Sequence, residues 1–198
     1  PGAVDIKLFD DILYVLKENS ISAYKLNSYE SGEISVKLIG SLEANNSYLF
    51  TSMDVAGENI YISEASSGKV LKTSTDLNVF STVISKLTAP SSVAYGDRSL
   101  YVAEKGKLSI YDLAGNLKKQ VDGSYTSVTY NSNNLFAISD KAKKIDRFNS
   151  SLESLSPLAY EGYCLGLTDI EAKEYGLYIC DYSRREIMVY TNETLDIS

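Results

Sequence analysis

The sequence predicts an all-β protein, a five-bladed β-propeller with a short last blade. The first observation is a pattern of aliphatic, aromatic and aliphatic residues that recurs five times along 198 residues. Its aromatic positions lie on average about 41 residues apart, close to the roughly 40–45 residues of a four-stranded propeller blade. The second observation is that no segment combines a sustained helical period with capping residues, so no substantial helix is expected. The five copies are Leu13-Tyr14-Val15, Ile60-Tyr61-Ile62, Leu100-Tyr101-Val102, Leu135-Phe136-Ala137 and Leu177-Tyr178-Ile179.

Each copy lies between two further β-rich runs, which predicts antiparallel strands joined by hairpins. The earlier runs are residues 4–6, 53–55, 93–95, 128–130 and 169–171, and the later runs are 21–24, 70–73, 108–111, 145–148 and 187–190. Turn-forming residues such as Asn131-Ser132-Asn133-Asn134 separate the strands. A weaker fourth strand follows in units two to four. In the first unit, the segment 27–32 is expected to lengthen the last hairpin.

The middle strand of each unit is apolar at consecutive positions, so both of its faces must be buried. Sheets that are covered on both sides fit stacked blades. The alternative fold is a β-sandwich, but its strands usually alternate apolar and polar residues because one face of each sheet is exposed to water. We expect Tyr61, Tyr101 and Tyr178 to be buried between blades. We also expect a single domain over residues 1–198, with blades at approximately 1–50, 51–90, 91–126, 127–165 and 166–198.

The closing of the ring is the open question of this prediction, and the last blade is expected to be incompletely closed. Residues 191–198 follow Tyr190 and suffice for a short fragment, while three residues precede Val4. Three alternatives remain: the fifth blade is short, the natural protein continues beyond Ser198, or another chain completes the edge by strand addition.

The segment 100–117, LYVAEKGKLSIYDLAGNL, resembles a blade of the NHL and YVTN propeller families. It has an aliphatic-Tyr-Val strand, an acidic residue, a short basic loop, an aliphatic strand that ends in an aromatic residue, and a Gly-Asn turn. Four units keep this pattern, and the first departs from it because Lys17 stands where the acid is expected. The resemblance implies a scaffold role, with members that bind proteins, RNA or sugars and members that build cell surfaces. It implies no single activity.

Composition excludes several classes of function. The net charge of -7, from 19 basic and 26 acidic residues, opposes binding of nucleic acid or of anionic membranes in bulk. Histidine is absent, which excludes Ser-His-Asp triads, Cys-His pairs and histidine zinc sites. Calcium loops and phosphate-binding glycine motifs are also absent, so we expect no cofactor. No apolar run approaches the roughly 18 residues of a membrane span.

The two cysteines, Cys164 and Cys180, are too few for a disulfide framework. A turn centred near Tyr175 would pair Cys180 with a residue near Ile170. Because a bridge requires Cα atoms within roughly 7 Å, we predict that the two cysteines are not bonded.

The hairpins that follow the middle strands carry the repeated polar signature, an acid followed by one or more bases. In a propeller these hairpins gather at one end of the ring, where bases from neighbouring units would form a basic sector that recognises a partner. The alternative is an ion pair across each hairpin, worth about 0–1 kcal/mol when exposed. The predicted basic sector consists of Lys141, Lys143, Lys144, Arg184 and Arg185, and the predicted surface tyrosines are Tyr160, Tyr163 and Tyr182.

These observations favour a non-enzymatic binding or structural module at a cell or particle surface, which implies an extracellular or cell-surface location. Its partner would be a protein, or a second copy bound through a blade edge or the charged hairpin rim. The alternative function is a propeller hydrolase or lactonase with a divalent metal bound by first-strand acids. The candidate metal ligands are Asp5, Asp54, Asp169 and Glu171.

Overall fold

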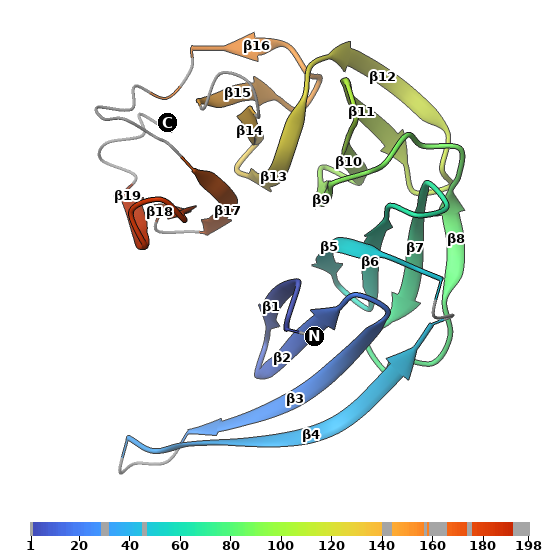
Figure 1. Cartoon of the computed structure of the whole chain (residues 1–198), viewed down its shortest axis with the longest axis vertical. Coiled ribbons are helices and arrows are strands. Elements are labelled where there is room, and N and C mark those ends of the chain that lie inside the picture. The colour runs from blue at the N-terminus through green and yellow to red at the C-terminus, as the bar shows by residue number, and fades with distance from the viewer. Residues whose placement is uncertain are drawn as a thin grey trace. The chain divides into compact units, whose positions relative to one another are not determined.

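The computed structural model describes residues 2–28, 32–44, 47–139, 144–156, 158, 166–173 and 176–191. In this part of the chain all regular structure is β-strand (Figure 1). No described element is a helix that could cross a membrane. The chain divides into two compact units, Pro1–Pro90 and Ser91–Ser198.

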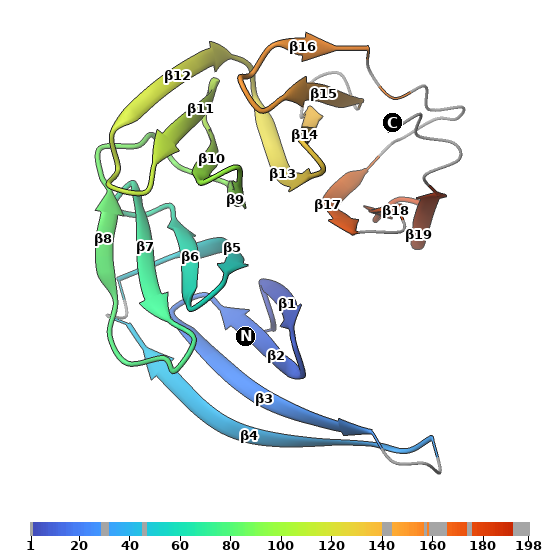
Figure 2. The same cartoon turned by 180° about the vertical axis from the view of Figure 1, so that it is seen from behind.

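The first unit contains two four-stranded antiparallel sheets, each built from strands that are consecutive in the chain (Figures 1 and 2). The strands of the first sheet are β1 (Asp5–Phe9), β2 (Ile12–Lys17), β3 (Ser20–Ser28) and β4 (Ile34–Glu43). Those of the second sheet are β5 (Phe50–Ala56), β6 (Asn59–Glu64), β7 (Lys69–Ser74) and β8 (Ser81–Ile84). The β3–β4 hairpin is the longest in the described chain. This agrees with the lengthened last hairpin that the sequence predicts for the first blade.

The second unit continues the same plan with three sheets. The third sheet consists of β9 (Ser92–Gly96), β10 (Ser99–Glu104), β11 (Lys107–Asp112) and β12 (Leu117–Asp122). The fourth consists of β13 (Tyr125–Asn131), β14 (Asn134–Ser139), β15 (Ile145–Asn149) and β16 (Ser154–Leu155). The fifth has three described strands, β17 (Leu167–Lys173), β18 (Gly176–Asp181) and β19 (Glu186–Thr191). The predicted all-β organisation with five sheets is confirmed.

Tight turns join the first two strands of the third and fourth sheets. Asp97 and Arg98 between β9 and β10 have φ values of 46° and 54°, and Ser132 and Asn133 between β13 and β14 have 48° and 64°. Two consecutive positive φ values are typical of the two-residue turns whose twist matches antiparallel strands. In these two sheets the turn residues therefore fix the register of the middle strand against the first strand.

Each middle strand has two faces of different kinds, which we call the aromatic face and the aliphatic face, and both faces are buried in β6, β10 and β14. On β2, Tyr14 and Leu16 of the aromatic face pack in one core with Ile60 and Ile62, which form the aliphatic face of β6. These four side chains are fully buried. The consecutive apolar residues of the middle strands thus build cores between sheets, as predicted.

The second unit repeats this packing twice. Tyr101 and Ala103 of the aromatic face of β10 share a core with Leu135 and Ala137 of the aliphatic face of β14. In the same way, the aromatic face of β14, with Phe136 and Ile138, packs with the aliphatic face of β18. In all three cores the aromatic face of one sheet meets the aliphatic face of the next.

The prediction of buried tyrosines holds for two of the three. Tyr61 and Tyr101 are buried, whereas Tyr178 is 38% exposed, so the prediction for Tyr178 is wrong. The reason is its position in the fifth sheet. Tyr14 and Tyr101 are covered by the next sheet of their unit, and no described strand follows β19 in the second unit to cover Tyr178.

Cys180 carries a free thiol. Its partner across the sheet is Asp169, one residue from the predicted position near Ile170. Burial, together with the negative charge of Asp169, raises the pKa of the thiol. Cys164 lies outside the described residues, so the absence of a disulfide stays a prediction that the intact mass with and without reductant checks.

Candidate functional site

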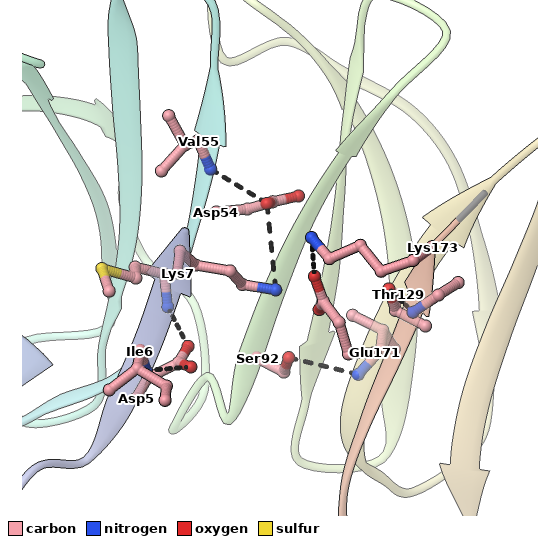
Figure 3. A network of polar contacts seen from close by, with 12 residues as sticks. Asp5, Ile6, Lys7, Asp54, Val55, Ser92, Thr129, Glu171 and Lys173 are labelled. Carbon is pink, nitrogen blue, oxygen red and sulfur yellow. Dashed lines mark hydrogen bonds and ion pairs between the residues drawn. The ribbon is translucent and has the colours of Figure 1, made fainter. Parts of the chain in front are cut away.

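The first strands carry polar side chains that connect neighbouring sheets, and Figure 3 shows them from close by. In the first unit, Asp5 of β1 accepts hydrogen bonds from the backbone N–H of Ile6 at 2.7 Å and of Met53 on β5 at 2.8 Å. Lys7 Nζ lies 4.0 Å from Asp54 Oδ1, and the N–H of Val55 donates to the same carboxylate oxygen at 2.9 Å. Both carboxylates therefore hold β1 against β5.

The second unit uses hydroxyl groups for the same task. The N–H of Val128 donates to Ser92 Oγ at 3.2 Å, and the N–H of Ala172 donates to Thr129 Oγ1 at 3.0 Å (Figure 3). Ser127 Oγ donates to Asp169 Oδ1 at 2.7 Å. These contacts tie β9 to β13 and β13 to β17, and two of them satisfy backbone N–H groups.

The register of the first strands corrects the positions assigned to the acids. Asp54 lies opposite Tyr61, and the residues opposite the corresponding Tyr14 and Tyr178 are Lys7 and Glu171. The predicted alignment had placed Asp5 at the level of Asp54, two residues away from the observed counterpart.

The metal-site alternative finds no support in this geometry. Lys173 Nζ lies 2.6 Å from Glu171 Oε1, and Asp5 and Asp54 are engaged as described above. Among the residues that the structure describes, no group of three or more acidic or cysteine side chains is placed to hold a metal ion.

The hairpin acid of the second sheet, Glu64, is fully buried. Its carboxylate accepts hydrogen bonds from the N–H groups of Leu49 at 3.0 Å, Ser66 at 2.7 Å and Ser67 at 2.9 Å, and from both serine hydroxyls. Burial alone would raise the pKa of Glu64, but these donors outweigh it and lower the pKa to about 2. Glu64 is thus an ionised clamp that ties the hairpin to the segment before β5.

The expectation of an ion pair across this hairpin is corrected by the contacts of its base. Lys69 lies opposite Glu64 in the ladder, but its ammonium group lies over the ring of Tyr48, 5.6 Å from the ring centre. The buried carboxylate is satisfied by short-range backbone and serine donors, and the long lysine side chain is left to pack on an aromatic ring.

Asp181 of the fifth sheet forms the same clamp. Its Oδ1 accepts from the N–H of Ser183 at 2.9 Å, from Ser183 Oγ at 2.6 Å and from the N–H of Arg184 at 3.2 Å. The hydroxyl of Ser183 is the main cause of a lowered pKa of Asp181. The N–H of Tyr182 donates to the carbonyl of Gly166 at 2.9 Å, as that of Ala65 donates to Leu49 in the second sheet. The backbone of residues 181–184 is therefore held in a defined turn.

This turn presents three of the predicted site residues to solvent. Tyr182 is 80% exposed, and Arg184 and Arg185 are exposed beside it. Arg185 adopts a φ of 57°, a left-handed conformation that is unusual for a residue other than glycine. Its side chain has no hydrogen-bond or ion-pair partner among residues whose placement is described.

The other predicted site residues are placed less completely. Lys144 is exposed and pairs with Asp146 of its own hairpin, Nζ to Oδ1 at 2.7 Å. Lys141, Lys143, Tyr160 and Tyr163 lie outside the described residues, so one contiguous basic sector stays a prediction.

Sequence reasoning missed the serines that complete the two clamps, Ser66 and Ser183. A usable signal was present, because each serine follows its hairpin acid by two residues, in Glu64-Ala65-Ser66 and Asp181-Tyr182-Ser183. A serine at this spacing can offer both its N–H and its hydroxyl to the acid.

A small hollow in the second unit is lined by residues of the third and fourth sheets. Its volume is about 250 Å³, below the roughly 300–1,000 Å³ of most ligand pockets. Lys118 at its wall donates from Nζ to Ser99 Oγ at 3.0 Å. The lining residues are Asp97, Ser99, Ile110, Lys118, Lys119, Ser150 and Ser151.

No protein-family model matches this sequence, and no curated protein matches it. Solved structures do resemble it. A streptogramin B lyase structure aligns over 96% of this chain and 68% of its own, with a TM-score of 0.68 and 15% identity. The fold is a β-propeller. A nidogen/laminin complex aligns over 94% of this chain and 90% of that chain, with a TM-score of 0.62 and 11% identity. The computationally designed protein Ika8 aligns over 96% and 71%, with a TM-score of 0.60 and 10% identity. At these identities the likeness shows the β-propeller fold alone, and the number of blades comes from the five sheets of this chain.

Proposed function

We propose that this propeller is a non-enzymatic binding module that recognises an acidic segment of a protein partner through its hairpin rim. The observation that carries the proposal is the clamped turn at Asp181. Oδ1 of its acid accepts hydrogen bonds from Ser183 and from the backbone N–H of Arg184, and the side chains of Arg184 and Arg185 are exposed, so they can meet another molecule.

The chemistry of the turn suits such a partner. Tyr182 offers a rigid ring with a polar end, and arginine binds carboxylates through two parallel hydrogen bonds. The molecule as a whole carries a charge of -7, so an acidic segment can approach only where bases gather locally. Lys141, Lys143 and Lys144, which follow β14 in the chain, would extend this basic surface.

A location at a cell or particle surface is part of the proposal. It is supported by the resemblance of segment 100–117 to NHL and YVTN blades, which includes proteins of cell surfaces. The nidogen/laminin complex is a protein complex that contains a similar fold, and it supports the idea of a protein partner without identifying one.

The test uses poly-L-glutamate immobilised on a solid support as the acidic probe. We expect the native protein to be retained and the double variant Arg184→Glu, Arg185→Glu to be lost from the support. The matched control is Lys86→Glu, Lys119→Glu. These two lysines are also exposed, and Lys86, like Arg185, has a positive φ, of 66°.

Retention of the control with loss of the rim variant supports the proposal. Equal retention of the rim variant and the native protein would overturn it, and so would a native protein that does not bind the probe. Thermal melts of both variants check that they fold, since exposed charges change stability by about 0–1 kcal/mol.

A further inference from the structure

No other described sheet of the first unit covers the aliphatic face of the first sheet. Five large apolar side chains of β1 and β4 on this face are each more than half exposed, from 53% for Leu8 to 68% for Ile34. Their cross-strand partners on β2 and β3 lie on the same face. The exposed residues are Ile6, Leu8, Ile34, Val36 and Leu38.

The same face is buried in the sheet that follows. On β6, Ile60 and Ile62 are fully buried against the aromatic face of β2. The β3–β4 hairpin is long (Figures 1 and 2). It enlarges the uncovered surface, because Val36 lies opposite Leu26 and Leu38 lies opposite Tyr24. Contiguous apolar patches of this kind on soluble proteins mark interaction surfaces.

In the fifth sheet the situation is reversed, because no other described sheet of the second unit covers its aromatic face. Tyr178 on β18 lies directly opposite Val189 on β19, and Cys180 lies opposite Ile187. Val189 and Ile187 are both more than half exposed. The opposite face of the same sheet, with Leu177 and Ile179, is buried in the core with Phe136.

We propose that two copies of this chain associate head to tail, with the aliphatic face of the first sheet of one copy packed on the aromatic face of the fifth sheet of the other. All three sheet-to-sheet cores described above join these two kinds of face. The uncovered surfaces are one of each kind, so they are the two halves of an interface that the protein already uses three times.

The proposal is independent of the hairpin rim and uses none of its residues. Because the two contacting surfaces differ, the contact is heterologous, and each copy keeps one uncovered face after pairing. Association therefore continues beyond a dimer at high concentration unless a ring closes.

Sedimentation velocity of the purified protein over a range of concentrations tests the proposal. We expect the native chain to associate as its concentration rises. The first-sheet variant Val36→Lys, Leu38→Lys and the fifth-sheet variant Ile187→Lys, Val189→Lys should each sediment as monomers. The control variant Val79→Lys, Leu117→Lys changes equally exposed apolar residues outside both faces and should associate like the native chain.

A mixture of the two face variants gives the most specific result. Each variant retains the face that the other lacks, so an equimolar mixture should form dimers and nothing larger. A native chain that stays monomeric at every concentration would overturn the proposal. A fifth-sheet variant that associates like the native chain would overturn it as well, because it would indicate a contact of first sheet with first sheet or a pairing of β4 edges. All four substituted residues are exposed, so folding should persist, and circular dichroism checks it.

Discussion

Glu64 illustrates how one buried carboxylate can organise a hairpin without a basic partner. Its oxygens meet two serine residues and the N–H of Leu49, and hydrogen bonds from such donors to a charged acceptor are worth about 1.5–3 kcal/mol each. This is more than an exposed ion pair with Lys69 would contribute. Glu64 is therefore a structural residue of its hairpin.

The clamp predicts a particular pH dependence. The pKa of Glu64 falls from its ordinary 4.5 to about 2 on folding, so its stabilisation is fully present above about pH 4.5 and is lost as the pH falls through about 2. We expect Glu64→Gln to be less stable than the native chain by about 2–3 kcal/mol at pH 7. The difference in unfolding free energy should shrink between pH 4.5 and 2. Denaturant titrations at several pH values measure it, and a difference that grows on acidification would contradict the clamp.

Two tyrosines at equivalent positions of the repeat should respond differently to truncation. Tyr101 is fully buried, donates to the carbonyl of Ser150 at 2.9 Å and stacks on Tyr130 with ring centres 5.0 Å apart. Tyr101→Ala should cost about 3–5 kcal/mol. Tyr178→Ala, at a partly exposed ring, should cost on the order of 1 kcal/mol or less. Chemical denaturation of the two variants compares them, and equal losses would show that Tyr178 is covered in solution.

At the scale of the elements, the sequence predicts a strand correctly where its residue pattern recurs in every blade. The aliphatic-aromatic-aliphatic triplets predicted the middle strands β2, β6, β10, β14 and β18, because a strand buried on both faces must be apolar at consecutive positions. The first strands are less constrained, since their polar residues can bond either to their own backbone or to the next sheet. Asp5 and Asp54 both accept a hydrogen bond from the N–H that follows them, so an aspartate can serve the same local role at two different levels of the strand. The exposure of Tyr178 could not be predicted, because it depends on whether another sheet covers it.

Close packing of first strands gives a prediction at Gly96, the last residue of β9. A Cβ at this position would overlap the ring of Tyr130 on β13. We expect Gly96→Ala to destabilise the protein by about 1–3 kcal/mol, since the ring must move to admit a methyl group.

Gly40 on β4 is the matched control. A Cβ there would have Leu77 Cδ1 as its nearest neighbour at 3.9 Å, an ordinary contact. Gly40→Ala should be neutral or stabilising by about 0.5–1 kcal/mol, because alanine loses less backbone entropy in a strand. Thermal melts compare the two variants, and a larger loss at Gly40 than at Gly96 would contradict the packing described here.

The molecule as a whole consists of repeated sheets that gain their cores from neighbours, so its stability is a property of interfaces more than of single sheets. The sequence predicts a single domain over residues 1–198, and the structure divides the chain into two compact units. Whether these units unfold together is not yet tested, so the single domain stays a prediction. Scanning calorimetry checks it. One domain should give one transition with equal calorimetric and van't Hoff enthalpies, and two separate transitions would contradict it.

Ionic strength should separate the two modes of association proposed for this protein. Raising the salt concentration from about 0.1 to about 1 M shortens the Debye length from about 10 to about 3 Å. Capture on poly-L-glutamate depends on Arg184 and Arg185, so it should be lost at high salt. Head-to-tail association depends on apolar side chains such as Val36 and Ile187, which salt does not screen. It should instead strengthen, because two copies with a charge of -7 each repel one another less when that charge is screened. Sedimentation velocity and probe capture at both salt concentrations measure the two trends. Association that weakens with salt would show that charged groups, and not the uncovered sheet faces, hold the copies together.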